Sequence, residues 1–152
     1  MSFEREVSIL KDIISTNNSF FLTLHINPDA DACGSMLAFY HYLKGLNKDV
    51  YLYSSDRIQD NLKILPYVEL IKHTIDKKNF DVGVFIECST LDRAGDHIKD
   101  ISFKKTISID HHITAQRYAD LNIYDFNVSS TAEIIYDIFE LLNVKIDTII
   151  AT

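Results

Sequence analysis

The chain has 152 residues, of which 47% are hydrophobic and 24% are charged, a composition typical of one globular domain and not of a disordered chain. Its net charge of −7 excludes a broad basic surface that binds duplex DNA, although a short nucleic-acid substrate is compatible with it because metals can supply positive charge locally. No apolar run approaches the roughly 18 residues of a membrane span, and early acidic residues argue against a secretory signal. The two cysteines form no CxxC motif, so we expect reduced thiols and a cytoplasmic protein.

Hydrophobic spacing along the chain predicts alternating helices and strands. Val7, Leu10 and Ile14 recur at helical spacing, apolar β-rich runs such as FFLTLHI are typical of buried strands, and Ser130 and Glu133 form a capping box before another helix. In chain order we predict a helix over residues 2–16, a strand over 20–26, a loop over 27–35, a helix from 36 to about Gly45, a strand over 49–55, a short helix over 58–65, strands over 81–87, 105–111 and 121–126, and a helix over 134–142. This alternation predicts an α/β fold with a doubly wound, mainly parallel sheet and helices on both faces.

Three side chains of metal-binding type fall within seven residues, where a predicted strand gives way to a helix: His25, Asp29 and Asp31. This is the carboxyl edge of the sheet, where α/β folds place their sites. Oxygen and imidazole ligands together suit Mn²⁺, with Mg²⁺, Co²⁺, Zn²⁺ or Fe²⁺ also possible. Gly34 would let the backbone approach a ligand, and we predict that Ser35 caps the helix. The alternative is an Asn-Pro-Asp turn with surface carboxylates, which does not account for a histidine and two acids beside a buried strand.

Two further groups of polar residues end predicted strands. Asp110, His111 and His112 stand at the end of the predicted strand KTISIDH, and because adjacent side chains diverge, one histidine could bind a metal while the other faces a substrate. Glu87 ends the mostly apolar strand DVGVFIE, which favours a metal ligand that could bridge two ions. The alternative for His111 and His112 is an exposed histidine pair after a strand. The alternative for Glu87 is a carboxylate that caps the following helix.

Together these motifs resemble the DHH phosphoesterases, which include RecJ-like exonucleases, NrnA-like nanoRNases and phosphatases, dinucleotide phosphodiesterases and family II inorganic pyrophosphatases. The resemblance covers about residues 20–152, and GSMLAFYHYLKGLNKDVYLYSSD and SSTAEIIYDIF look most like the NrnA-type branch. It rests on these residues: His25, Pro28, Asp29, Asp31, Gly34, Ser35, Glu87, Asp110, His111 and His112. The resemblance implies an N-terminal DHH domain of a normally two-domain enzyme.

The resemblance also implies a centre of two metal ions. One ion would be held by His25, Asp29 and Glu87. The other would be held by Asp31, Glu87 and His111, together with an Asp from a fourth motif. A water that bridges the ions would then attack phosphorus in line.

Three other residues receive roles by resemblance. His112 would contact the scissile phosphate, and Asp110 would orient a histidine from outside the metal shell. Arg93 could reach a phosphate, and a matching arginine occurs in relatives. A salt bridge between Arg93 and Asp92 or Asp96 is the alternative. His41, His73 and His97 lie outside any motif, and we interpret them as surface or packing residues.

Two departures from the family pattern stand out. Glu87 replaces the usual Asp, and the extra methylene moves the carboxylate by roughly 1.5 Å. The last residues, IDTIIAT, are typical of a helix that leads to the fourth-motif Asp, so over residues 1–152 we expect a DHH domain cut before that motif and without the C-terminal substrate-binding domain. We therefore expect this chain alone to have little activity, and its exposed docking face to favour a homodimer.

These observations predict a metal-dependent phosphoesterase. Its substrates would be short oligonucleotides, dinucleotides or nucleoside bisphosphates such as pAp, and a membrane partner is not expected. A nucleotide- or metal-binding module without turnover and an inorganic pyrophosphatase are the alternatives.

Overall fold

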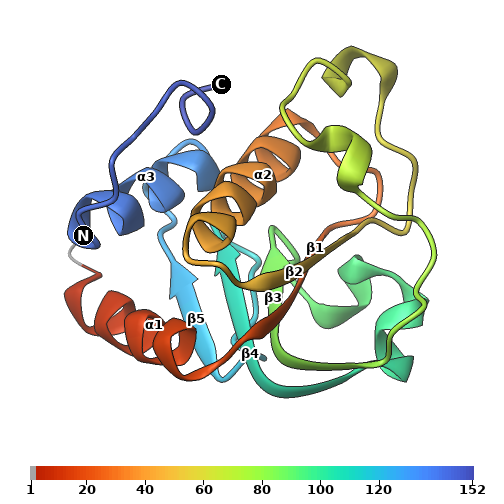
Figure 1. Ribbon diagram of the computed structural model, residues 1–152, viewed down its shortest axis with the longest axis horizontal. Coiled ribbons are helices and arrows are strands. Elements are labelled where there is room, and N and C mark those ends of the chain that lie inside the picture. The colour runs from red at the N-terminus through yellow and green to blue at the C-terminus, as the bar shows by residue number, and fades with distance from the viewer. Residues whose placement is uncertain (1–2) are drawn as a thin grey trace.

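The computed structural model describes residues 3–152, and its centre is a parallel sheet of five strands in the order β2-β1-β3-β4-β5 (Figure 1). The strands are β1 (Ser19–Leu24), β2 (Asp49–Tyr53), β3 (Asn79–Ile86), β4 (Ser102–Asp110) and β5 (Leu121–Tyr124). All neighbouring strands pair in parallel. The chain runs from β1 outward to β2 and then returns to β3 on the other side of β1, so the strand order reverses between β1 and β3. The predicted α/β fold with a doubly wound parallel sheet is confirmed.

Helices cover both faces of this sheet, but they differ in kind between the two faces. In the described range the α-helices are α1 (Glu4–Thr16), α2 (Ala30–Gly45) and α3 (Thr131–Leu141). Their buried residues share one apolar cluster with Phe20 and Leu22 of β1. On the opposite face Phe21 lies in a second cluster, which the short 3₁₀ helices η3 (Leu91–Ala94) and η4 (Asp96–Asp100) help to cover. The strand therefore alternates between the two cores, as its period of two requires.

The N-terminus of α2 differs from the prediction. The helix begins at Ala30 and not at residue 36, because Asp29 caps it and accepts a hydrogen bond from the backbone N–H of Ala32 at 3.0 Å. Ser35 therefore lies inside the helix, and its predicted capping role is wrong. Much of the predicted loop over 27–35 is the first turn and a half of α2, so the acidic motif sits on a helix end.

Other boundaries agree more closely. Residue 2, the predicted start of the first helix, lies outside the described residues, and α1 begins at Glu4. The predicted helix over 58–65 is wrong in length, because only the 3₁₀ turn η1 (Asp60–Leu62) forms there. The segment IDTIIAT forms a single turn, in which the N–H of Ala151 donates to the carbonyl of Asp147 at 3.1 Å.

The capping box of α3 is confirmed. The backbone N–H of Glu133 donates to Oγ of Ser130 at 3.3 Å, and the Glu133 carboxylate accepts from the backbone N–H of Ser129 at 2.9 Å. These bonds fix the first turn of α3, with Thr131 as its first residue. That turn points toward the end of α2 that carries Asp31.

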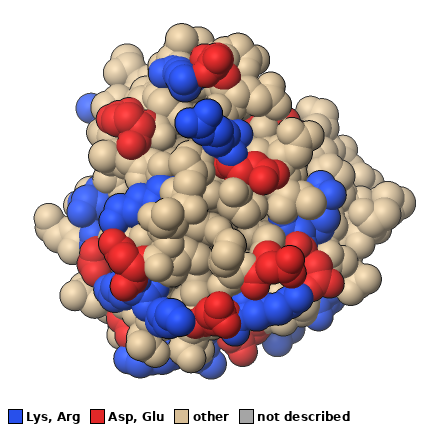
Figure 2. All heavy atoms as spheres, turned by 90° about the vertical axis from the view of Figure 1, so that its right-hand side faces the viewer, with Lys and Arg blue, Asp and Glu red and all other residues tan. Residues whose placement is uncertain are grey.

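Charged side chains of both signs are mixed on the surface. On the face shown in Figure 2, lysine and arginine side chains are interspersed with aspartate and glutamate, without a continuous basic patch. Across residues 3–152, no helix is long and apolar enough to cross a membrane.

Candidate metal centre

The predicted metal ligands meet at the carboxyl edge of the sheet, at the point where the strand order reverses. His25 follows β1, Glu87 follows β3 and His111 follows β4. Asp29 and Asp31 flank the start of α2. Because parallel strands end at the same edge, residues far apart in sequence come together here.

The first cluster contains His25, Asp29 and Glu87. Nε2 of His25 lies 3.6 Å from Oε2 of Glu87 and 3.9 Å from Oδ2 of Asp29. Nδ1 of His25 lies 2.7 Å from the carbonyl oxygen of Ile26, so Nδ1 carries a proton and Nε2 is left free as a ligand atom. Asp29 divides its oxygens, with Oδ1 on the α2 cap and Oδ2 toward the histidine.

The second cluster contains Asp31, Glu87 and His111. Nε2 of His111 lies 3.7 Å from Oδ2 of Asp31 and 3.7 Å from Oε1 of Glu87. Among the residues described, these two clusters are the groups in which three or more ligand atoms lie within 4.8 Å of one another. Glu87 belongs to both clusters and offers one oxygen to each, so its position suits a carboxylate that bridges two ions.

Glu87 is buried, and its carboxylate makes no hydrogen bond among the described residues. Its side chain is 1% exposed. The alternative in which Glu87 caps the following helix does not hold, because a capping oxygen would accept a backbone N–H. A buried carboxylate of this kind is costly unless a cation or donor compensates it. Two aspartates and two histidines around a shared buried glutamate therefore fit divalent metal ions.

Asp31 is held by the N-terminus of α3. Its Oδ2 accepts the backbone N–H of Thr131 at 2.7 Å, and its Oδ1 accepts that of Ala132 at 2.9 Å. Burial, with the neighbouring Glu87 carboxylate, nevertheless raises the pKa of Asp31 to about 6. Burial also opposes ionisation of Glu87, but the facing groups of His25, Asp31 and Thr131 outweigh it and lower the pKa of Glu87. The two neighbouring carboxyl groups thus compete for the ionised form.

His112 lies outside both metal clusters. Its Nδ1 lies 2.7 Å from Oδ1 of Asp110, which also accepts the backbone N–H of His112 at 2.9 Å. The other oxygen of the fully buried Asp110 accepts from Oγ of Ser89 at 3.1 Å. Asp110 thus fixes the orientation of the ring and leaves Nε2 of His112 free. The two histidines have different surroundings, as the sequence predicted.

An open pocket of about 540 Å³ adjoins the first cluster. It is lined by His25, Asp29, Glu87, Ser89, Thr90, Arg93, His112, Thr114 and Gln116. The structure thus places Arg93 and His112 beside the predicted metal ligands. Among the ion pairs of the described residues, Arg93 pairs with neither Asp92 nor Asp96. Lys99 lies 3.1 Å from Asp96 and 3.9 Å from Asp92 instead.

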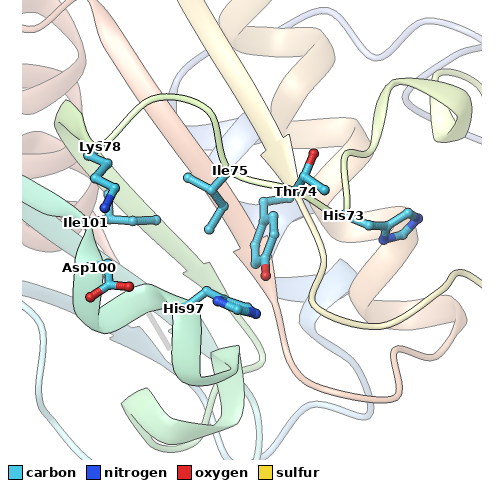
Figure 3. Close-up of a pocket in the computed structure, with 8 residues that line it drawn as sticks. His73, Thr74, Ile75, Lys78, His97, Asp100 and Ile101 are labelled. Carbon is cyan, nitrogen blue, oxygen red and sulfur yellow. The ribbon is translucent and has the colours of Figure 1, made fainter.

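A separate cavity of about 320 Å³ lies next to the end of β2. Figure 3 shows Lys78 and Asp100 at one end and His73 at the other, with His97 between them. Its polar groups do not form a cluster of ligand atoms like those at Glu87. This cavity is therefore not the metal centre.

Sequence reasoning missed three contacts around the site. Thr131 and Ser89 were not singled out, although both lie next to predicted residues. His41 was interpreted as a surface or packing residue, but its Nε2 lies 2.9 Å from Oδ2 of Asp147 and ties the last turn to α2. Thr131 lies within the predicted capping box between Ser130 and Glu133, but the sequence assigned it no role of its own.

Residues 19–152 match the family model described as "DHH family, N-terminal domain", and the chain therefore belongs to the DHH family. The bifunctional oligoribonuclease and PAP phosphatase NrnA of Thermus thermophilus is 31% identical over 134 residues. That alignment covers 87% of this chain and 40% of NrnA, so the chain spans less than half the length of this relative.

Two solved structures share the fold. An exopolyphosphatase-related protein from Bacteroides fragilis has a TM-score of 0.82 at 21% identity, over 92% of this chain and 44% of that one. The exonuclease RecJ bound to manganese has a TM-score of 0.52 at 12% identity, over 95% of this chain and 39% of RecJ.

Proposed function

We propose that the chain is the metal-binding domain of a phosphoesterase that hydrolyses phosphate esters through two metal ions. The observation that carries this proposal is the position of Glu87, whose two buried, unpartnered oxygens face separate ligand clusters. The family and the manganese in the RecJ structure support Mn²⁺ as the ion.

Each ligand has a defined task in this proposal. His25, Asp29 and Glu87 would hold one ion, and Asp31, Glu87 and His111 would hold the other. Two ions held there would supply an activated water and neutralise charge on the phosphate.

The pocket beside the first cluster would position the substrate. His112, oriented by Asp110, presents Nε2 to the phosphate, and Arg93 offers a second positive group on the same pocket wall. Positioning of this kind places the phosphate next to the metal ligands before the chemical step.

The proposed substrates are short oligonucleotides, dinucleotides or nucleoside bisphosphates such as pAp. The name of the Thermus relative, an oligoribonuclease and PAP phosphatase, supports this class. The net charge of −7 also favours short substrates over long duplexes, because few phosphates could be neutralised away from the metals. A cytoplasmic location and a homodimer are part of the same proposal.

One observation favours a second candidate, a nucleotide- or metal-binding module without turnover. The second cluster has three ligands within residues 3–152, and the resemblance implies a fourth carboxylate there. An ion that lacks an anionic ligand would bind more weakly, and turnover would suffer.

Hydrolysis with Mn²⁺ separates these candidates. The protein from the complete reading frame, and residues 1–152 alone, would be assayed with pAp, pGpG and pyrophosphate. We expect pAp or pGpG turnover that Glu87→Gln abolishes and that Glu140→Gln, an exposed matched control, retains. Nucleotide binding without hydrolysis by the complete protein would instead establish the binding module, and turnover of pyrophosphate alone would establish a pyrophosphatase.

A further inference from the structure

Two ligands of the first cluster are joined by a short segment that belongs to neither a helix nor a strand. His25 follows β1 and Asp29 caps α2, so residues 26–28 set the separation of their side chains. Within this segment Asn27 has a φ of 53°, in the left-handed region that asparagine tolerates but few other residues adopt. Contacts from outside can therefore decide whether the segment keeps this conformation.

Two other parts of the chain hold the backbone of this segment. The N–H of Ile26 donates to the carbonyl of Arg93 at 2.7 Å. The N–H of Asn27 donates to Oδ2 of Asp56 at 2.7 Å. An ionised carboxylate is a stronger acceptor than a neutral carbonyl, and it belongs to a side chain. The Asp56 contact is therefore both a firm restraint on Asn27 and one that a substitution can remove.

The loop that carries Asp56 is itself anchored to the fold. Ser54 directly follows β2 and is fully buried, and its Oγ donates to the carbonyl of Asp56 at 2.7 Å. The N–H of Ser54 donates to the carbonyl of Lys72 at 3.0 Å. Further along the loop, Nε2 of Gln59 donates to the carbonyl of Pro28 at 3.4 Å. The loop after β2 therefore contacts the segment at two points from a fixed base.

We infer that Asp56 is a positioning residue, whose carboxylate fixes the backbone at Asn27 and thereby the separation of His25 and Asp29. This inference rests on the proposed function. Asp56 belongs to neither cluster of ligand atoms found in residues 3–152, and it does not line the pocket beside the first cluster. It would therefore act through the backbone, without touching an ion or a substrate. Its loss should weaken the ion of the first cluster more than the ion of the second.

Three variants of this chain test the inference by calorimetric titration with Mn²⁺ and by NMR measurement of amide hydrogen exchange without Mn²⁺. Asp56→Ala removes the acceptor, and Asp56→Asn keeps an acceptor oxygen but removes the charge. Asp120→Ala is the matched control. Like Asp56, Asp120 is exposed and accepts a backbone N–H, that of Thr106 at 2.8 Å, but it lies at the amino end of β5 and so at the opposite edge of the sheet.

The variants should differ in both measurements. Exchange of the Asn27 amide should be slow in the metal-free parent and in Asp120→Ala, and faster in Asp56→Ala. Asp56→Ala should weaken the binding of one Mn²⁺ ion about tenfold and of the other less, as the loss of groups that orient metal ligands does elsewhere. Asp56→Asn should retain most of the affinity, because its amide oxygen can still accept the N–H of Asn27.

Four results would contradict these expectations. Parent-like Mn²⁺ affinity in Asp56→Ala would overturn the inference and leave the proposed metal centre intact. An equal loss of affinity in Asp120→Ala would overturn it, because a general loss of stability would then be the cause. A loss in Asp56→Asn as large as in Asp56→Ala would overturn it by showing that the charge of Asp56 acts on the ions directly. A parent chain that binds no Mn²⁺ would overturn both this inference and the proposed function.

Discussion

The Glu87 carboxylate lies 3.6 Å from Nε2 of His25, although its side chain is 1% exposed and makes no hydrogen bond within the described structure. The neighbouring groups lower the pKa of Glu87, and Glu87 in turn raises the pKa of His25. Removal of the Glu87 charge should therefore weaken both the stability of the fold and the binding of metal ions.

Glu87→Gln should abolish the binding of two Mn²⁺ ions and lower the metal-free stability at pH 7, because the groups around Glu87 lower its pKa and so favour its ionised form in the folded protein. Glu87→Asp should retain metal binding and substantial activity in the complete protein. Calorimetry gives the stoichiometry and urea unfolding gives the stability, with Glu140→Gln as the exposed control. Two ions bound by Glu87→Gln with parent affinity would rule out the bridging role.

Asp29 and Asp31 each bond to the N-terminus of a helix and also lie in a candidate metal cluster, so replacement by alanine should disturb both. Asp29→Asn keeps an effective N-cap for α2 and removes a metal ligand, whereas Asp29→Ala loses the cap as well and should cost about 1 kcal/mol of stability. We expect both variants to lose Mn²⁺ affinity and only the alanine variant to lose stability. Equal stability of the two variants in urea would show that the Asp29 cap contributes little.

His112 lies outside both clusters, so His112→Ala should leave Mn²⁺ affinity unchanged. In the complete protein it should lower kcat about a hundredfold, because a preorganised contact to the reacting phosphate is lost. Ser89→Ala should lower kcat less, since Asp110 keeps its bond to His112. Steady-state kinetics and calorimetry on the same samples separate the two effects. A His112→Ala protein with weakened metal binding and normal kcat would reverse this assignment.

Asp81 should make stability depend on acid pH. Its carboxylate accepts from Lys104 Nζ at 2.6 Å and from the backbone N–H groups of Ser19 at 2.9 Å and Asn18 at 3.1 Å, and these contacts lower its pKa. Because the folded-state pKa is lowered, ionised Asp81 stabilises the protein at pH values above the ordinary aspartate pKa near 4. This stabilisation is lost as the pH falls below that value.

Asp81→Ala should therefore cost about 1–2 kcal/mol at pH 7, and the difference from the parent should shrink below about pH 4. Urea unfolding of the parent and of Asp81→Ala at several pH values measures this difference in stability. Lys104→Gln removes only the exposed partner and should cost less. A cost of Asp81→Ala that is constant from pH 7 to pH 3 would show that the charge of Asp81 is not responsible.

The sheet and the ligands that follow its strands were predictable, because the carboxyl ends of parallel strands meet at one edge. His25, Glu87 and His111 each follow such a strand, so their convergence required no knowledge of side-chain geometry. The residue types also indicated the kind of chemistry before any contact was known.

Contacts that depend on tertiary packing were not predictable. Asp31 and Thr131 are 100 residues apart, and their hydrogen bond depends on how α2 and α3 pack. The start of α2 at Ala30 was missed because Asn-Pro-Asp equally suits a turn and a helix cap. The His41–Asp147 contact also depends on packing, and neither His41 nor Asp147 belongs to a motif that could have pointed to it.

Anomalous diffraction from crystals of this chain grown with Mn²⁺ tests the shared role of Glu87 most directly. Two anomalous peaks are expected, one among His25, Asp29 and Glu87 and the other among Asp31, Glu87 and His111, each about 2.0–2.6 Å from a Glu87 oxygen. A map in which no Mn²⁺ peak lies within that distance of Glu87 would contradict the two-metal centre.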